Sequence, residues 1–184
     1  MDRVFHLAAI CNVSPPYAVL HPTNVVAVER ITRLAMQAGV RRYLQMSSSS
    51  VYGRHRGRPF LEESERAPRD DYGRSKAQGE EMVWKRIAEG LPAIIARPCT
   101  VYGPGCTDGA GKVFSRPTSI MAIPGSGRQL LSNVRVEDVA AASVHLSELD
   151  GVEGQAFNIA DDSHPELGEA LALAAEAFGS RPPR

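Results

Sequence analysis

Tyr72 and Lys76 stand four residues apart in the segment Tyr72-Gly73-Arg74-Ser75-Lys76, and together they could carry acid–base chemistry. In a helix this spacing places both side chains on one face, one turn apart. A phenol with a pKa of about 10 is a poor base at neutral pH, and a neighbouring ammonium group lowers that pKa. Such a phenol can pass a proton to or from an alcohol or ketone while hydride moves elsewhere. The same spacing also fits a packed tyrosine at a helix start beside a solvated lysine.

Strand-like and helix-like stretches alternate along the chain, and this order predicts an α/β fold with a parallel sheet. The predicted strands cover residues 4–9, 43–46, 93–96 and 155–160. The predicted helices cover residues 24–38, 72–89, 136–149 and 165–178, and residues 11–23 and 54–71 are predicted loops. In such sheets, ligands bind beyond the C-terminal ends of the strands. Ala8-Ala9, Ser47–Ser50 and Arg97-Pro98 follow three predicted strands, so they bring polar or turn-forming residues to one edge.

The composition is that of an ordinary globular protein, with 43% hydrophobic residues, 23% charged residues and a formal net charge of zero. A length of 184 residues indicates one domain, or a large part of one. The charge balance argues against nucleic acid or an anionic membrane as the main partner.

Cys11, Cys99 and Cys106 form no CxxC pair and have no clustered histidine partner. This pattern argues against a disulfide framework and against a zinc site. The chain has no run of about 18 apolar residues that could span a membrane, and its first residues lack the pattern of a signal peptide. We therefore expect a cytoplasmic protein without a metal.

A series of motifs resembles the extended short-chain dehydrogenase/reductases, the NAD(P)-dependent epimerase/dehydratase group, and occurs in the family's order. The motifs are Phe5–Ala9, Thr23–Val25, Ser47–Gly53, Tyr72–Lys76, Arg97–Gly105, Val136–Ala140 and Phe157–Ile159. The resemblance implies a partial Rossmann-like parallel sheet that starts at the family's fourth strand. It also implies that residues 1–184 form a single truncated domain, with substrate-side segments near residues 104–132 and 161–184.

The resemblance also implies catalytic roles for four residues. Tyr72 would donate or accept the proton, and Lys76 would lower the pKa of Tyr72 and hold the nicotinamide ribose. Ser48, with Ser49 as the alternative, would hydrogen-bond the substrate oxygen, although a serine run at a strand end can also cap nearby backbone. Asn24 would help to order the proton path, although asparagine is also well suited to cap a helix N-terminus.

The implied cofactor is NAD or NADP. The residues that would line its cleft are Ala8, Ala9, Ser47, Tyr72, Lys76, Pro98 and Val101. The family's GxxGxxG turn, whose N–H groups receive the pyrophosphate, has no counterpart here, because Gly39 is the only glycine before Gly53. We therefore expect weak or absent NAD(P) binding by the chain as given.

The family pattern before residues 4–9, about 60 residues by the size of its βα units, has no counterpart in this sequence. Without it, residues 4–9 are expected to expose a flat apolar edge, and the chain is expected to be marginally stable. A partial sequence, a misplaced start and an inactive remnant are all open explanations.

The substrate is indicated only by class. Nucleotide-sugar members of the family often carry a basic residue shortly before the segment that here reads Val134–Asp138, and the matching place is Leu130–Ser132. Arg128 and Arg135 are nearby and could substitute. Residues 123–128 resemble instead the members related to 3β-hydroxysteroid dehydrogenases, which act on apolar alcohols. We favour a nucleotide sugar because that class is larger.

A different class of function is a non-catalytic fragment that mediates association. In the family, the helices that match residues 24–38 and 72–89 pair across a homodimer as a four-helix bundle, so a dimer is expected under either hypothesis. Cofactor binding is therefore the feature that discriminates between them. The sequence does not distinguish NAD from NADP, or net redox chemistry from epimerisation or dehydration.

Overall fold

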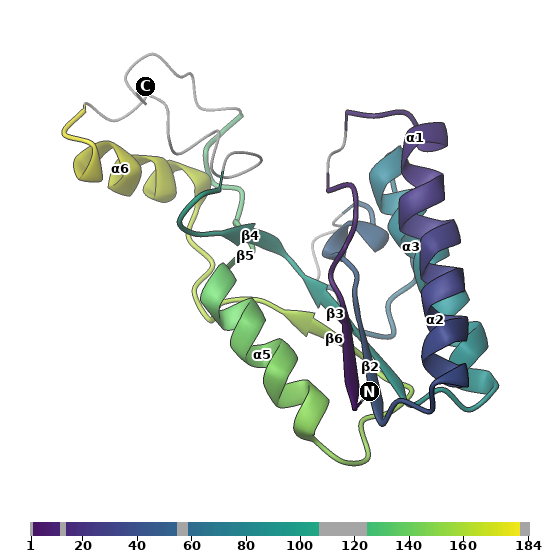
Figure 1. The fold of residues 1–184 in the computed structure, drawn as a ribbon. Coiled ribbons are helices and arrows are strands. Elements are labelled where there is room, and N and C mark those ends of the chain that lie inside the picture. The colour runs from purple at the N-terminus through teal and green to yellow at the C-terminus, as the bar shows by residue number, and fades with distance from the viewer. Residues whose placement is uncertain (1, 12–13, 55–58, 107–124, 181–184) are drawn as a thin grey trace. The chain divides into compact units, whose positions relative to one another are not determined.

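The computed structural model describes residues 2–11, 14–54, 59–106 and 125–180. The chain forms two compact units (Figure 1), of which the first comprises Met1–Cys99 and Val139–Ile159. The second comprises Thr100–Asp138 and Ala160–Arg184. The segments assigned from the sequence to the substrate side, near residues 104–132 and 161–184, both belong to the second unit. Residues 107–124 and 181–184 of those segments lie outside the described residues.

The first unit is built on a sheet with the strand order β1-β2-β3-β6, in which every neighbouring pair is parallel. The strands are β1 (Arg3–His6), β2 (Arg42–Met46), β3 (Ala93–Pro98) and β6 (Ala156–Ile159). The central strands β2 and β3 are almost completely buried, as is usual in a parallel sheet that is covered on both faces. The predicted α/β fold with a parallel sheet is thus confirmed.

Two helices, α2 (Ala27–Gln37) and α3 (Asp71–Ala88), pack side by side on one face of this sheet. Val28 of α2 and Val83 of α3 meet Tyr43 and Ile95 of the sheet in one buried apolar cluster. On the other face runs α5 (Val136–Glu148), which belongs to the first unit from Val139 onward. Because helices cover both faces of the sheet, the segments that follow the strands lie at its C-terminal edge.

The first helical region starts earlier than the sequence pattern predicts. A helix begins at α1 (Tyr17–His21), continues through a π-helical turn, η1 (Pro22–Val26), and runs on into α2. The prediction of a loop over residues 11–23 is therefore wrong for residues 17–23. Pro22 has helical angles, φ −59° and ψ −39°, and its carbonyl accepts the N–H of Ala27. The proline is accommodated by a π turn rather than by ending the helix.

The start of α1 has a partner that lies far away in the sequence. Pro16 at its N-cap offers no side-chain hydrogen bond. Instead, Asp71 at the start of α3 accepts the backbone N–H of Tyr17 through Oδ2 at 2.8 Å. A cap supplied from another helix is not visible as a local sequence signal, which explains why this start was missed.

The second unit contains a parallel strand pair, β4 (Thr100–Tyr102) with β5 (Asn133–Arg135), and the helix α6 (Leu167–Ala177). A capping box between Glu166 and Glu169 starts α6. Tyr102 donates its hydroxyl to Asp161 Oδ2 at 3.0 Å within this unit.

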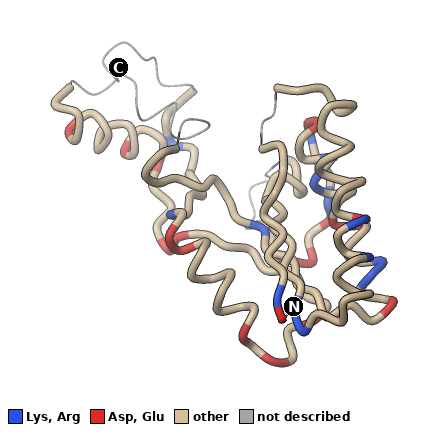
Figure 2. Tube along the Cα trace, viewed as in Figure 1, with Lys and Arg blue, Asp and Glu red and all other residues tan. Residues whose placement is uncertain are grey.

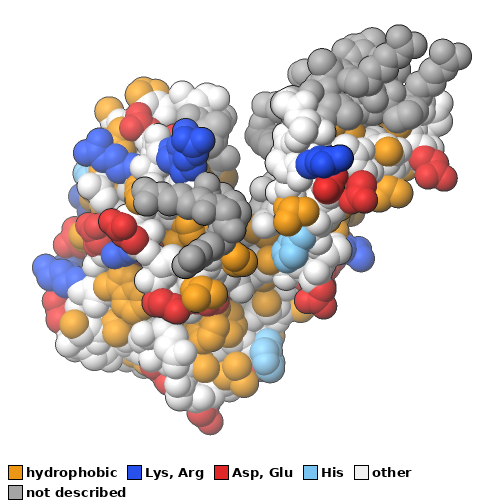
Figure 3. All heavy atoms as spheres, turned by 180° about the vertical axis from the view of Figure 1, so that it is seen from behind, with side chains coloured by type: hydrophobic (Ala, Val, Ile, Leu, Met, Phe, Trp, Pro, Cys, Tyr) orange, Lys and Arg blue, Asp and Glu red, His pale blue; other side chains and the backbone are white. Residues whose placement is uncertain are grey.

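At the edge of the described sheet, Phe5 of β1 is 38% exposed, and Leu7, just after β1, is 55% exposed. This agrees with the apolar edge expected for residues 4–9. Elsewhere both signs of charge are interspersed along α2 and α3 (Figure 2), and charged and apolar side chains alternate over the face seen in Figure 3. Among the described residues, no helix is long and apolar enough to cross a membrane.

Candidate active site

Tyr72 lies in the first turn of α3, and the start of this helix is set by local hydrogen bonds. Asp70 is the N-cap residue and accepts the backbone N–H of Gly73 through its side chain at 2.7 Å. Gly73 also permits close packing, because a Cβ there would stand 2.6 Å from the carbonyl oxygen of Ser50. Helix α3 can therefore approach the serine segment that follows β2.

The structure brings Ser48, Tyr72 and Lys76 together at the C-terminal end of β2. Lys76 donates from Nζ to the carbonyl oxygen of Met46, the last residue of β2, at 2.6 Å. Ser48 Oγ donates to Ser50 Oγ at 3.2 Å and accepts the backbone N–H of Ser50 at 3.2 Å, so it caps nearby backbone. Ser48 also lies close enough to Tyr72 to act on the pKa of its phenol. Lys76 is only 5% exposed, so the alternative of a solvated lysine is wrong.

The expected effect of Lys76 on Tyr72 is not what the structure shows. The pKa of Tyr72 is raised to about 12, first because the phenol is buried and then because of the thiol of Cys11. The nearby Ser48 hydroxyl acts in the opposite direction and lowers the pKa. Lys76 is not among the main causes of this shift, and its ammonium group donates to the Met46 carbonyl. The predicted lowering of the Tyr72 pKa by Lys76 is therefore wrong for this structure.

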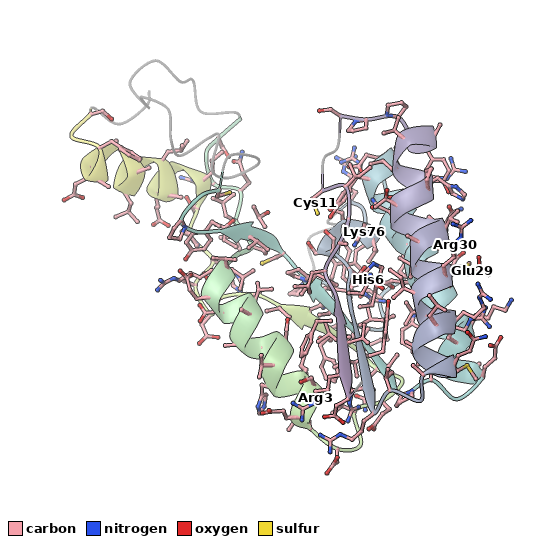
Figure 4. The ribbon with its side chains drawn as sticks, in the orientation of Figure 1. Arg3, His6, Cys11, Glu29, Arg30 and Lys76 are labelled. Carbon is pink, nitrogen blue, oxygen red and sulfur yellow. The ribbon has the colours of Figure 1, made fainter. Side chains whose placement is uncertain are left out.

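Lys76 itself has a lowered pKa, because burial disfavours its charged form. The negative charges of Cys11, when ionised, and of Glu80 oppose that shift. Cys11 is exposed. In Figure 4, Cys11 and Lys76 lie near the C-terminal end of β1, whose last residue is His6. His6 is buried and has a lowered pKa, first through burial, with the charge of Lys76 also contributing.

Asn24 connects the segment after β1 to α3. Its Nδ2 donates to Ser75 Oγ at 2.9 Å and to the Ile10 carbonyl at 3.1 Å, and its Oδ1 accepts from the Ile10 N–H at 2.9 Å. Asn24 lies inside η1 and is 2% exposed, so the alternative role as a helix N-cap is wrong. Its part in a proton path stays a prediction.

The residues predicted to line a cofactor cleft fall into different environments. Ala8 is exposed and Ala9 half-buried in the segment that follows β1, while Pro98 is buried at the end of β3. Ser47 is buried, and its hydroxyl donates to Glu80 Oε1 at 2.5 Å. Its side chain is thus engaged within the protein. Val101 belongs to β4 of the second unit.

A buried ion pair between Glu80 and Arg97 was missed by the sequence analysis. Arg97 donates from Nε to Glu80 Oε1 at 2.8 Å and from Nη2 to Oε2 at 2.7 Å. The predicted end of the third strand at residue 96, before Arg97-Pro98, is wrong, because β3 runs to Pro98. One signal was present: Glu80 lies four residues after Lys76, on the same helix face.

The ion pair extends through Tyr52 to β6. Arg97 donates from Nη1 to the Tyr52 hydroxyl at 2.7 Å, and Tyr52 donates to Asn158 Oδ1 at 2.7 Å. The ring of Tyr52 is stacked on Phe60, with centroids 4.9 Å apart. These contacts fix the chain just after the serine segment. Among the described residues, no group of histidine, cysteine and carboxylate side chains could hold a metal ion.

A parallel sheet with helices on both faces defines a Rossmann-like α/β domain, and comparison with known proteins identifies its family. Residues 1–160 match the NAD dependent epimerase/dehydratase family. The chain belongs to this family.

Known relatives include both sugar-nucleotide and other enzymes. The chain is 34% identical over 110 residues to a UDP-glucose 4-epimerase of Vibrio cholerae, covering 55% of this chain and 34% of that protein. It is 27% identical over 185 residues to the 4-hydroxy-2-methyl-3-oxo-4-farnesyl-3,4-dihydroquinoline-1-oxide ketoreductase of Stigmatella aurantiaca, covering 97% of this chain and 54% of that protein. The chain spans about half the length, or less, of these curated relatives.

Among solved structures, the chain is similar to MoeE5 in complex with UDP-glucose and NAD. The TM-score is 0.85 at 31% sequence identity, and the match covers 99% of this chain and 64% of that one.

Proposed function

We propose that this chain carries the acid–base residues of an NAD-dependent epimerase or dehydratase that acts on a nucleotide sugar. The observation that carries the proposal is the meeting of Ser48, Tyr72 and Lys76 at the C-terminal end of β2. The epimerase from Vibrio cholerae and MoeE5, which was solved with UDP-glucose and NAD, support the substrate class and the cofactor.

In the proposed reaction, Tyr72 exchanges a proton with the oxygen of a sugar carbinol or ketone. With its pKa raised to about 12, Tyr72 is a neutral phenol at neutral pH and is prepared to donate its proton to a ketone oxygen. Ser48, which lies near the Tyr72 phenol, would hold the same substrate oxygen. NAD, when bound, supplies the group that takes up hydride from the carbon and returns it.

Lys76, Ala8, Ala9 and Pro98 are the residues of the first unit that would hold the cofactor, and Val101 is the candidate from the second. An ammonium group has three N–H donors, and the described contacts use one of them, on Met46. Lys76 thus keeps donors for ribose hydroxyls. Because the sequence has no glycine-rich turn, we expect NAD or NADP to bind weakly to this chain alone.

Tyr72→Phe tests the proposal. It keeps the ring and removes the hydroxyl, so kcat with UDP-glucose or dTDP-glucose and NAD should fall by at least about a hundredfold. Tyr17→Phe is the matched control, because the Tyr17 hydroxyl is hydrogen-bonded to Gln78 on α3 and lies outside the site. Full activity in folded Tyr72→Phe would refute the assigned role. Absence of turnover in the unchanged protein, together with absence of NAD binding, would favour a non-catalytic fragment.

A second candidate function is the reduction or oxidation of an apolar ketone or alcohol. The similarity to the Stigmatella aurantiaca ketoreductase favours it, because that match covers 97% of the chain. The Tyr72 chemistry would be the same and the substrate pocket would differ. Turnover of a panel of UDP- and dTDP-sugars against sterol-like and quinoline ketones, with NADH and NADPH, separates the two candidates.

We also propose that two copies associate through α2 and α3, the helices predicted to pair across a homodimer. The exposure of Leu34 (56%) and Met36 (38%) on α2 supports this proposal. Sedimentation equilibrium of the unchanged protein and of Leu34→Glu should show a dimer and a monomer, respectively. A monomeric unchanged protein at micromolar concentration would contradict it.

A further inference from the structure

Three consecutive residues at the end of β2 lie next to residues on one face of α3. The Met46 carbonyl accepts from Lys76 Nζ at 2.6 Å, and the Ser47 hydroxyl donates to Glu80 at 2.5 Å. Ser48 lies close enough to Tyr72 to act on the pKa of its phenol. The α3 partners are four residues apart, at positions 72, 76 and 80. Of these three α3 residues, Glu80 is the one to which the proposed proton transfer assigns no role.

The buried carboxylate of Glu80 has hydrogen-bond donors at both of its oxygen atoms. It is 1% exposed and accepts four hydrogen bonds. On Oε1 the donors are Ser47 Oγ and Arg97 Nε, and on Oε2 they are Arg97 Nη2 at 2.7 Å and Arg66 Nη1 at 3.3 Å. A carboxylate with four acceptor positions is thereby satisfied. The geometry is bidentate towards Arg97, which fixes orientation as well as distance.

Through these bonds Glu80 joins three elements at the same edge of the sheet. Ser47 follows β2, Arg97 lies in β3, and Glu80 itself belongs to α3. Because Ser47 lies between Met46 and Ser48, the bond to Glu80 holds the backbone that receives Lys76 on one side and presents Ser48 on the other. Removal of the carboxylate would remove the hydrogen bond that ties Ser47 to α3.

We propose that Glu80, held by Arg97, is a positioning residue that sets the places of Lys76 and Ser48 relative to Tyr72. The expected effect of Glu80 on kcat rests on the proposed function. The expected effect of Glu80 on Lys76 does not, because the titration of Lys76 can be measured without substrate.

The negative charge of Glu80 acts on the pKa of Lys76, so a change at Glu80 can be observed at Lys76. Lys76 faces Glu80 and Tyr72 on its own helix, Cys11 after β1 and His6 on β1, and Arg97 of β3 lies behind Glu80. Replacing Glu80 by glutamine removes a negative neighbour of the ammonium group and leaves Arg97 unpaired. Both changes disfavour the protonated form of Lys76.

The test is Glu80→Gln, with Glu81→Gln as the matched control on the exposed side of α3. Lysine labelled with ¹³C at Cε gives few signals, since Lys76, Lys85 and Lys112 are the lysines of the chain, and Lys76→Met assigns the signal of Lys76. In Glu80→Gln the Lys76 signal should titrate at lower pH than in the unchanged protein. In turnover of UDP-glucose or dTDP-glucose, kcat should fall between about tenfold and a hundredfold, with KM changed less.

An unchanged Lys76 titration and an unchanged kcat in folded Glu80→Gln would overturn the inference. If that variant does not fold, Ser47→Ala decides, because it removes the bond to β2 and leaves the Glu80–Arg97 pair in place. The Lys76 signal should then move while that of Lys85 stays, and a stationary Lys76 signal would overturn the inference. If the unchanged protein turns over no nucleotide sugar, the proposed function fails, and the titration still decides on Glu80.

Discussion

Gly79 of α3 lies against the backbone of Asn24 in η1, so closely that a Cβ at position 79 would stand 2.5 Å from the Asn24 carbonyl oxygen. This contact brings the π-helical turn directly onto the helix that carries Tyr72 and Lys76. It also explains a glycine in the interior of a helix, where glycine is otherwise unfavourable. The same packing lets Asn24 Nδ2 reach Ser75.

Gly79→Ala should destabilise the protein by about 1–3 kcal/mol, because the added methyl group overlaps a backbone carbonyl that cannot move alone. Chemical denaturation measures the change in the free energy of unfolding. The control is Gly168→Ala in α6, where the nearest atom to an added Cβ is 3.5 Å away. There, alanine should be neutral or stabilising by up to about 1 kcal/mol. Equal effects at both positions would contradict the assigned contact.

Asp71→Ala should cost about 1 kcal/mol of stability, because it removes the acceptor that caps the start of α1 through the Tyr17 N–H. Amide hydrogen exchange should accelerate over residues 17–20 more than over the middle of α3. Asp71→Asn keeps an acceptor oxygen and should recover most of the loss. Slow exchange of α1 in Asp71→Ala would show that this helix start does not depend on α3.

Cys11→Ala should lower the pKa of Tyr72. The thiol lies close to the phenol and, when ionised, its negative charge raises that pKa. Phenolate absorbance near 295 nm follows the titration, and the difference from Tyr72→Phe isolates this tyrosine from the others. Cys106→Ala is the control, since Cys106 belongs to the second unit. A Tyr72 pKa that is the same with and without the Cys11 thiol would contradict the contact.

Tyr72 should also make stability fall in alkaline solution. Its pKa is raised from 10.0 in the unfolded chain to about 12 in the fold. The native state therefore holds the Tyr72 proton more tightly than the unfolded chain does. The resulting contribution to the free energy of unfolding is complete below pH 10 and is lost as the pH rises towards 12. In Tyr72→Phe the free energy of unfolding should decline less steeply over this window, as urea denaturation at several pH values would show. Parallel declines in both proteins would refute the shift.

Local patterns in the sequence were sufficient for much of the first unit. The buried runs of β2 and β3, and the apolar spacing of α2 and α3, follow from side-chain periodicity, which depends only on neighbouring residues. The placement of Tyr72 and Lys76 on one helix face follows from the same spacing, and the parallel sheet then brings Ser48 to the same edge.

The features that were missed depend on residues far apart in the chain. Helix α1 begins where Asp71 supplies its cap, 54 positions away, and Glu80 finds Arg97 across 17 positions. The sign of the Tyr72 pKa shift was also decided by the fold, because burial and Cys11 act on the phenol while Lys76 binds the Met46 carbonyl. The sequence by itself determined which side chains share a helix face or a strand. Only the tertiary structure decided which of them touch and how far each is removed from water, because hydrogen bonding and desolvation depend on partners brought together by folding.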